Sequence, residues 1–227
     1  MPNISKRQKN NLTLLEKDKI YFPEEAIEMA KKTANTKFRA SIEVHVRLGI
    51  DPKQSDQGVR GSVRLPAGTG KSKKIAAFVT EAKEKEARAA GAELVGGEDL
   101  VKKIKETGKT DFDIAVAEPA MMKNLAQVAK ILGQRGLMPN PKTGTVSEHV
   151  GAAIKEIAAG KVEFKNDDSG NLHQIIGKAD FDTEKLMQNF RAFVDAVNAA
   201  KPASVKKQFV LGISVNATMG PGIKVKI

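Results

Sequence analysis

The sequence predicts an α/β (α+β) protein of two domains: a discontinuous domain of split β-α-β type and, inserted into it, a Rossmann-like domain with three α/β/α layers. Two observations indicate this fold. Strands with one polar face, together with single helices, fill the first and last 67 residues, whereas the middle alternates short apolar strands with Ala-rich helices. We therefore expect the split domain at 1–67 plus 161–227 and the inserted domain at 68–160.

The first part of the split domain starts with a basic arm, MPNISKRQKNN, which we expect to be mobile. A helix is predicted at 24–34, because Pro23 and two acidic residues suit its first turn and the apolar residues have helical spacing. Strict alternation of apolar and polar residues at 38–50 predicts a half-buried strand. A second strand is expected at 59–66, where Pro66 ends it.

The second part of the split domain resumes this style after Gly160. The segments 161–166 and 171–178 are predicted to be paired strands joined by the turn DDSG. An amphipathic helix follows at 182–201, with Asp182 as its N-cap. The tail at 209–227 is predicted to form a strand, a turn and a strand.

The inserted domain shows the alternation that is typical of a parallel sheet covered by helices. Strands are expected at 74–79, 93–97 and 111–117, and helices at 81–92, 98–108, 121–136 and 147–160. Two chain crossings connect it to the split domain. Gly68, Thr69 and Gly70 at one crossing, and Gly160 at the other, suit either a hinge or two ordinary loops.

The net charge of +11 favours a polyanionic partner, of which nucleic acid is the commonest. The excess positive charge is distributed unevenly between the two domains. The insert has 15 basic and 12 acidic residues, a net charge of +3, and the remainder has 23 and 15, a net charge of +8. The split domain is therefore the better candidate for phosphate contacts, although a basic enzyme with a solvated surface has the same composition.

Several kinds of site find little support in the sequence. GTGKS at 68–72 resembles a phosphate loop, but Leu65 stands where that motif needs a glycine. The chain has no cysteine, and His45, His149 and His173 lack the spacing of metal ligands. We find no catalytic triad or marked carboxylate pair. We therefore expect a non-enzymatic protein with no metal and no cofactor, in the cytoplasm and without a membrane partner.

Two places look specialised for RNA. In TKFRASIE, Phe38 lies between two cations at the start of a strand; its ring could stack on a base, or it could equally be a core residue. In NATMGPG, Thr218 offers a hydroxyl, and the glycines permit a close backbone approach. An ordinary tight turn would contain the same residues.

Longer stretches resemble a known family. The segment GQRGLMPNPKTGTV at 133–146 resembles the signature of the L-one family of large-subunit ribosomal proteins, in its bacterial form. The stretches VHVRLGIDPKQSDQGVRGSVRLPAGTGK, GAELVGGEDLVKKIKE, KVEFKN, IIGKADF, AKPASVKK and TMGPG are similar to that family in the same order. The resemblance extends over nearly the whole chain from about residue 17.

The resemblance implies a function and a set of contacts. The family binds large-subunit rRNA at the mobile stalk near the tRNA exit site, assists release of deacylated tRNA, and in bacteria can repress its own operon mRNA. The implied protein is a monomer when free. The implied RNA contacts are Lys37, Phe38, Ser41, Glu43, Thr218, Met219 and Gly220, with Lys165, Asn166 and His173 as weaker candidates.

The sequence departs from the family at a few positions. Gly212 stands where some relatives have serine, and Asp168 where relatives often have lysine, which puts two contacts in doubt. The signature segment 133–146 could be a second RNA contact or purely architectural. Two other functions stay open: a nucleotide-binding α/β enzyme, which a nucleotide-binding assay would detect, and a DNA-binding architectural protein, which would not distinguish RNA from DNA.

Overall fold

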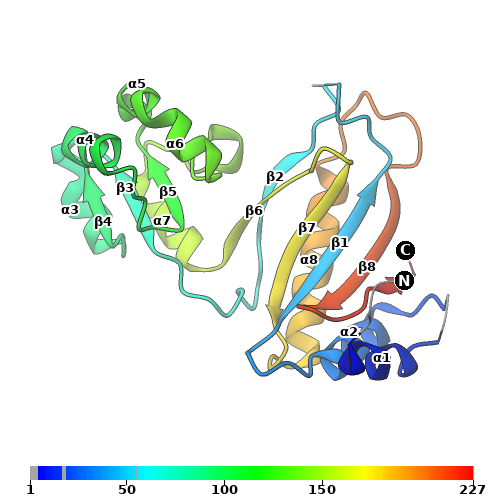
Figure 1. Ribbon diagram of the computed structural model, residues 1–227. Helices are drawn as coiled ribbons and strands as arrows, with labels where there is room; N and C mark the ends of the chain where they lie inside the picture. Colours follow the sequence, from blue (N-terminus) through cyan, green and yellow to red (C-terminus); the bar gives the residue numbers. More distant parts are fainter. Residues whose placement is uncertain (1–4, 17–18, 55, 227) are drawn as a thin grey trace. The chain divides into compact units, whose positions relative to one another are not determined.

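The computed structural model describes residues 5–16, 19–54 and 56–226 of the chain (Figure 1). Two compact units are present: one comprises 1–70 and 162–227, the other 71–161. Both combine helices with sheets, and the α/β (α+β) class expected from the sequence is correct.

A four-stranded antiparallel sheet organises the first unit. Its strands are β1 (Ser41–Leu48), β7 (Asn171–Lys178), β8 (Val210–Ala217) and β9 (Ile223–Val225), in the order β7-β1-β8-β9. Helix α8 (Thr183–Ala199) connects β7 to β8, and β1 lies between these two strands. This is the expected split β-α-β arrangement (Figure 1).

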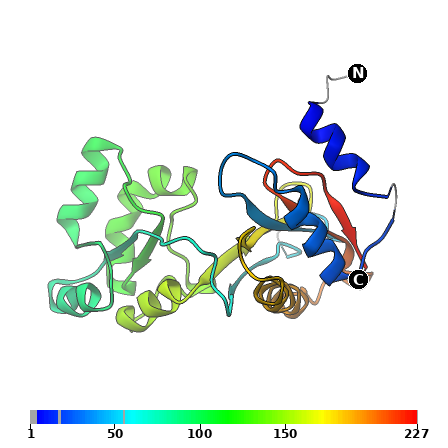
Figure 2. The same cartoon turned by 90° about the horizontal axis from the view of Figure 1, so that it is seen from below.

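One face of this sheet is covered and the other is open. The apolar residues of β1, Ile42, Val44, Val46 and Leu48, are buried in the main core. Helix α8 and helix α2 (Pro23–Thr33) pack against the sheet and supply much of that core (Figure 2, where α8 is seen end-on). Because side chains alternate along a strand, the polar residues of β1 lie on the opposite, open face.

Helix α8 follows the predicted apolar stripe, but its start differs in detail. Leu186, Phe190, Phe193 and Val197 are buried in the main core, as their spacing predicts. Asp182 occupies the N-cap position without accepting a hydrogen bond there. Its carboxylate lies 3.1 Å from Lys185 Nζ instead.

The predicted pairing of segments 161–166 and 171–178 is wrong. Strand β6 (Lys161–Lys165) pairs with β2 (Arg60–Arg64) in a separate two-stranded sheet, and β7 pairs with β1. A tight turn links β6 and β7, held by Asp167, whose Oδ1 accepts from the amides of Ser169 at 2.9 Å and Asn171 at 2.7 Å. Pairing with β1 brings the apolar face of β7 into the core.

The N-terminal arm is also more ordered than predicted. Helix α1 (Lys6–Thr13) begins at a capping box, in which Ser5 Oγ accepts from the Gln8 amide at 3.3 Å. The side chain of Asn11 is buried and donates to the Thr33 carbonyl at 3.0 Å. The expectation of a mobile arm is therefore wrong for residues 5–16, and residues 1–4 lie outside the described part.

The second unit contains a parallel sheet between two apolar layers. Strands β3 (Ile75–Phe78), β4 (Leu94–Gly96) and β5 (Ile114–Ala117) have the order β4-β3-β5. On one face Ala76 and Phe78 join a cluster with α4 (Glu98–Thr107). On the other, Ile75 and Ala77 join a cluster with α3 (Glu81–Ala89) and α7 (Val150–Ala158). The three predicted layers are present.

The single helix predicted at 121–136 is broken. The chain forms α5 (Met122–Leu125) and α6 (Ala129–Gln134), with 3-10 turns at Pro119–Met121 and Ala126–Val128. Val128, with φ of −110° and ψ of 9°, leaves the helical region. Because Met121, Leu125, Val128 and Leu132 all remain buried, tertiary packing outweighs the local preference for a continuous helix.

The signature segment 133–146 is held by its own polar side chains. Asn140 Oδ1 accepts from the Lys142 amide at 2.8 Å, and the Asn140 amide donates to Thr145 Oγ1 at 2.7 Å. The Thr145 carbonyl in turn accepts from the Ala117 amide at 2.9 Å, which joins the segment to the end of β5. These contacts give the segment an architectural role, and a second RNA contact there stays a prediction.

Asn189 holds the first chain crossing to α8. This fully buried side chain accepts from the Ala67 amide at 2.9 Å and donates to the carbonyls of Gly68 at 2.8 Å and Ile176 at 2.6 Å. A buried backbone group that loses its partner is costly, so these three bonds determine the path of the chain after β2.

We predict that Asn189→Ala lowers the free energy of unfolding by about 1–3 kcal/mol, because it leaves buried backbone groups without partners. Asn198→Ala, at an exposed position of the same helix, is the matched control and should change stability little. Urea unfolding followed by circular dichroism measures both. Equal stabilities of the two variants would contradict the role given to Asn189.

Candidate nucleic-acid interface

The open face of the four-stranded sheet carries the polar residues of three strands. Glu43, His45 and Arg47 of β1 alternate with its buried residues. In the register of the sheet they lie beside Asn216, Ser214 and Gly212 of β8. Helices α2 and α8 leave this face uncovered, since both pack against the opposite face of the sheet. The sheet therefore presents a polar surface made from both sequence-distant parts of the unit.

Thr218 joins the two ends of the predicted site. Its Oγ1 accepts from the Ser41 amide at 3.1 Å and donates to Glu43 Oε1 at 2.9 Å. The Thr218 amide also donates to the Ser41 carbonyl at 2.9 Å. Three residues predicted from separate parts of the sequence are thus brought together by one hydroxyl and one amide.

The turn after β8 has an unusual backbone. Met219 has φ of +65°, a left-handed conformation that side chains other than glycine adopt at a cost, and its side chain is 62% exposed. Gly220 is needed next, because a Cβ there would lie 2.9 Å from the Ala217 carbonyl oxygen. Arg7 Nη2 donates to the Met219 carbonyl at 3.0 Å and supports the turn from outside.

Phe38 is not a core residue. Its side chain is 53% exposed, and Lys37 before it is exposed as well. Arg39, the second cation of this segment, forms an ion pair with Asp180 at 2.6 Å, which lowers the pKa of that carboxyl. Of the two cations that flank the ring, Lys37 is the better placed for a phosphate, because Arg39 already has an acidic partner.

A buried lysine lies beneath the start of β1. Lys178 is 8% exposed, and its Nζ lies 3.0 Å from Ser41 Oγ and 3.5 Å from the Arg39 carbonyl. It thereby positions the Ser41 hydroxyl within the site. Sequence reasoning missed both Lys178 and Arg7, because only the folded chain shows which of many lysines and arginines reach these atoms.

Lys165 and Asn166 are not joined to this group. Lys165 is exposed at the end of β6. The Asn166 side chain is used within the protein: its Oδ1 accepts from the Val59 amide at 2.8 Å, and its Nδ2 donates to the Asp167 carbonyl at 2.9 Å. Asn166 thus shapes the turn before β7, and a direct RNA contact by its side chain would require breaking these bonds.

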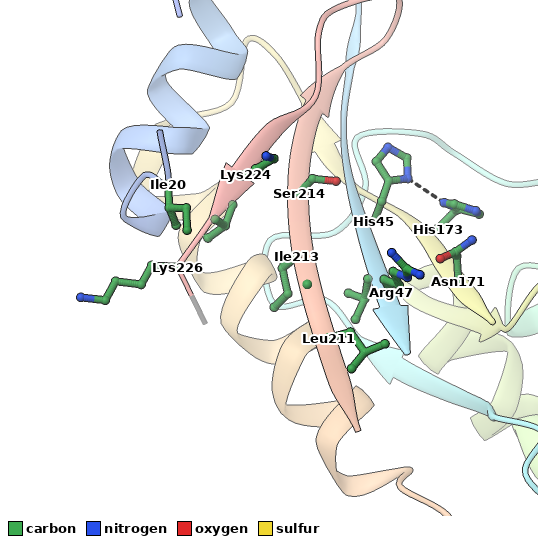
Figure 3. A pocket seen from close by; sticks show the side chains of 13 residues that line it. Ile20, His45, Arg47, Asn171, His173, Leu211, Ile213, Ser214, Lys224 and Lys226 are labelled. Atoms are coloured by element: carbon green, nitrogen blue, oxygen red, sulfur yellow. Dashed lines mark hydrogen bonds between the residues drawn. The ribbon is translucent and has the colours of Figure 1, made fainter. Parts of the chain in front are cut away.

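His173 has a partner that the sequence did not suggest. It lies opposite His45 in the sheet, and the two Nδ1 atoms are 2.7 Å apart (Figure 3). His45 Nε2 lies 2.7 Å from Asn216 Oδ1, and His173 Nε2 lies 3.4 Å from Asp167 Oδ2. Hydrogen bonds, first that from the Asn171 amide, lower the pKa of Asp167. The histidines therefore belong to a chain of four polar side chains.

The other candidate sites gain little from the structure. His149 stands alone at the start of α7, in the second unit. Among the described residues, no group of three or more histidine, aspartate or glutamate side chains is placed to hold a metal ion. Lys71–Lys74 run into strand β3 without forming a helix, so GTGKS lacks the helix N-terminus that a phosphate loop uses.

Comparison with known sequences decides the family. The model of the ribosomal protein L1p/L10e family matches residues 30–221. The chain belongs to this family. Relatives that carry the name large ribosomal subunit protein uL1 include those of Mycoplasma capricolum, with 50% identity over 226 residues, and Mesoplasma florum, with 48% identity over 227 residues. A third, from Mycoplasma mycoides, is 49% identical.

Each of these L1p/L10e relatives is covered over its full length, as is the chain itself. The family match includes β1, the turn at Thr218 and the signature segment, so the resemblance expected from these stretches is confirmed. Within the described residues, no helix has the length and apolar character to span a bilayer.

The hydroxyl of Thr218 has a structural role, because it is hydrogen-bonded to the Ser41 backbone and to Glu43. We predict that Thr218→Val, which keeps the shape, lowers the free energy of unfolding by about 1 kcal/mol, because the Ser41 amide and Glu43 lose a partner. Thr218→Ser keeps the hydroxyl and should stay near the parent. Thermal unfolding of the three proteins measures this, and a Val variant as stable as the Ser variant would contradict it.

Proposed function

We propose that the protein binds large-subunit rRNA at the mobile stalk near the tRNA exit site, through the open sheet face and the turn at 218–220. It acts there in the cytoplasm as a non-enzymatic component of the large ribosomal subunit, assists release of deacylated tRNA, and represses translation of its own operon mRNA. The free protein is a monomer. Membership of the L1p/L10e family and the names of the relatives support the ribosomal role.

The observation that carries the RNA-binding surface is the turn at Met219. A positive φ in a residue with a side chain is held only where the surrounding structure enforces it, and such positions gather at functional sites. Beside this turn, Thr218 holds Glu43, and the Ser41 hydroxyl lies against Lys178. The exposed apolar groups Met219 and Phe38 supply surfaces on which bases or sugars can pack.

The chemistry of the surface suits RNA better than DNA. Glu43 repels phosphate but can accept a hydrogen bond from a base or a 2′-hydroxyl. Lys37 and the basic excess of the unit supply attraction to the backbone. DNA has no 2′-hydroxyl to donate to such an acceptor. A nucleotide-binding enzyme is disfavoured by the loop at 68–72, which leads into a strand.

The direct test is binding to a transcript of the stalk region of large-subunit rRNA, with DNA of the same sequence as the comparison. We expect preference for the transcript, and an affinity that falls as salt rises, with a slope that reflects only a few phosphate contacts. Fluorescence anisotropy at several salt concentrations measures both. Equal binding of DNA would favour the architectural DNA-binding alternative, and an affinity independent of salt would reject phosphate contacts.

The Met219 side chain can be tested apart from the fold. Met219→Gly should leave the free energy of unfolding unchanged or raise it by up to about 1 kcal/mol, because glycine tolerates the positive φ. The same variant should weaken binding of the stalk transcript by about 1–3 kcal/mol, because an apolar contact is lost at the interface.

The control is Leu12→Ala, which also shortens an exposed apolar side chain but lies in helix α1, outside the turn at Met219. It should leave RNA affinity unchanged. Anisotropy titrations and urea unfolding of the same preparations separate the two effects. A Met219→Gly protein that binds RNA like the parent would remove this side chain from the interface.

A further inference from the structure

The Nδ1–Nδ1 contact between His45 and His173 restricts the protons that this pair can hold. At 2.7 Å the two nitrogens are hydrogen-bonded, so one must donate and the other must accept. Asn216 Oδ1, 2.7 Å from His45 Nε2, is an acceptor, which places the proton of a neutral His45 on Nε2. His45 Nδ1 then carries a lone pair, and His173 Nδ1–H is the donor.

The other nitrogen of His173 decides the charge. Its Nε2 lies 3.4 Å from a carboxylate oxygen of Asp167. Without a proton, Nε2 would present a lone pair to this carboxylate. With one, it donates, and His173 becomes an imidazolium whose two N–H groups both have acceptors. A second proton on the pair would have to occupy His45 Nδ1 and would break the 2.7 Å bond.

The chain Asp167–His173–His45–Asn216 can therefore take up one proton without rearrangement. Imidazole is the side chain whose charge depends most on pH near neutrality, so proton uptake here would be a change in the charge of the surface. The charged groups around the pair are Glu43 and Arg47 on β1, Asp167 and Asp168 in the turn before β7, and Lys224 on β9. Strand β8 contributes Ser214 and Asn216, which do not titrate.

The cleft on one side of the pair favours an anion. The histidines lie at the edge of a cleft of about 570 Å³ on the open face, with Arg47, Lys224 and Lys226 around it (Figure 3). None of the described residues that line this cleft is acidic. Both N–H groups of the charged His173 already have acceptors, so an RNA phosphate over the cleft would interact with its charge and not with a free N–H group. The side chain is 54% exposed, and the cations of the cleft would act together with it.

We propose that His45 and His173 form a contact for one RNA phosphate that is charged by a single proton. This rests on the proposed RNA-binding function and adds a pH dependence to it. Because the phosphate stabilises the protonated pair, RNA binding and proton uptake favour one another. The affinity is then higher when the pair holds the proton and falls when a rise in pH removes it. The uptake of one proton limits the slope to about tenfold per pH unit.

The position along the strand makes this a contact separate from the turn at Met219. His45 is four residues beyond Ser41, about 13 Å along β1. Both places lie on the same strand, so one RNA molecule that follows the sheet can reach them. The pair would thus extend the interface along the sheet.

The experiment is a titration of the parent with the stalk transcript between pH 5.5 and 8, at constant salt. Three variants accompany it: His173→Gln, which cannot be charged; His173→Lys, which carries a fixed charge; and His149→Gln, the matched control in the other unit. Circular dichroism of each protein at both ends of the pH range confirms that the fold is kept.

We expect the parent affinity to fall several-fold from pH 6 to pH 8. His173→Gln should bind at pH 6 as weakly as the parent does at pH 8, with most of the pH dependence lost. His173→Lys should keep high affinity at pH 8. His149→Gln should show the same pH dependence as the parent. Because all variants bind the same transcript, protonation of the RNA itself affects them equally and cannot explain a difference between them.

The outcomes separate this inference from the function on which it rests. If the parent binds the transcript but His173→Gln shows the same pH profile, the histidine contact is wrong and the RNA-binding function stands. If the parent binds the transcript at no pH, the proposed function is wrong and the histidine contact falls with it. Weak binding by His173→Lys at pH 8 would show that the charge is not what matters.

Discussion

The pairing of β1 with both β7 and β8 is the constraint on which the rest of the first unit depends. β1 comes from the first part of the chain, and its two neighbours come from the last part, after the whole second unit. The crossover through α8 lets β7 and β8 run on either side of β1 and covers their common apolar face. Each contact of the open face, from Ser41 with Thr218 to His45 with His173, joins strands that only this pairing brings together.

The same pairing makes a strained turn possible. Met219 leaves the end of β8 with a positive φ, and the cost is offset by contacts on both sides. On one side Thr218 binds the start of β1 through its amide and its hydroxyl, and on the other Arg7 binds the Met219 carbonyl. The turn is thus held in shape by the protein itself, so the proposed RNA contact would need little further ordering of this segment.

Net charge overstates how many cations are available to phosphates. Around the proposed interface, Arg39 is paired with Asp180, Arg7 is bonded to a backbone carbonyl, and Lys178 is buried against Ser41. These three contribute to the positive potential but hold the protein itself in shape. Lys37, by contrast, is exposed beside Phe38, and Arg47 lies on the open cleft. In the proposed interface, long-range attraction and direct contact would therefore come from different residues, as electrostatic steering allows.

The sequence by itself determined most of the local structure and the family. Apolar residues recur every 2 residues in β1 and about every 3.6 residues in α8, and strands and helices alternate in the second unit. These periods are visible in the sequence, because a strand or a helix that packs against a core must place its apolar residues on one face. The residues of the capping box at Ser5 are also visible in the sequence, although we expected a mobile arm. Helix α1 is held to the rest of the unit by Asn11, whose partners Thr33 and Asn35 lie more than 20 residues away in the sequence.

Only the tertiary structure decided which strands pair and which side chains meet. Residues 161–178 contain two good strands and a turn, and nothing local distinguishes a hairpin from strands that belong to two different sheets. The exposure of Phe38, the break at Val128 and the meeting of His45 with His173 likewise depend on what packs against them. Hydrogen bonds between side chains act over about 3 Å, so a sequence that leaves two residues more than a hundred positions apart cannot reveal them before the fold brings them together.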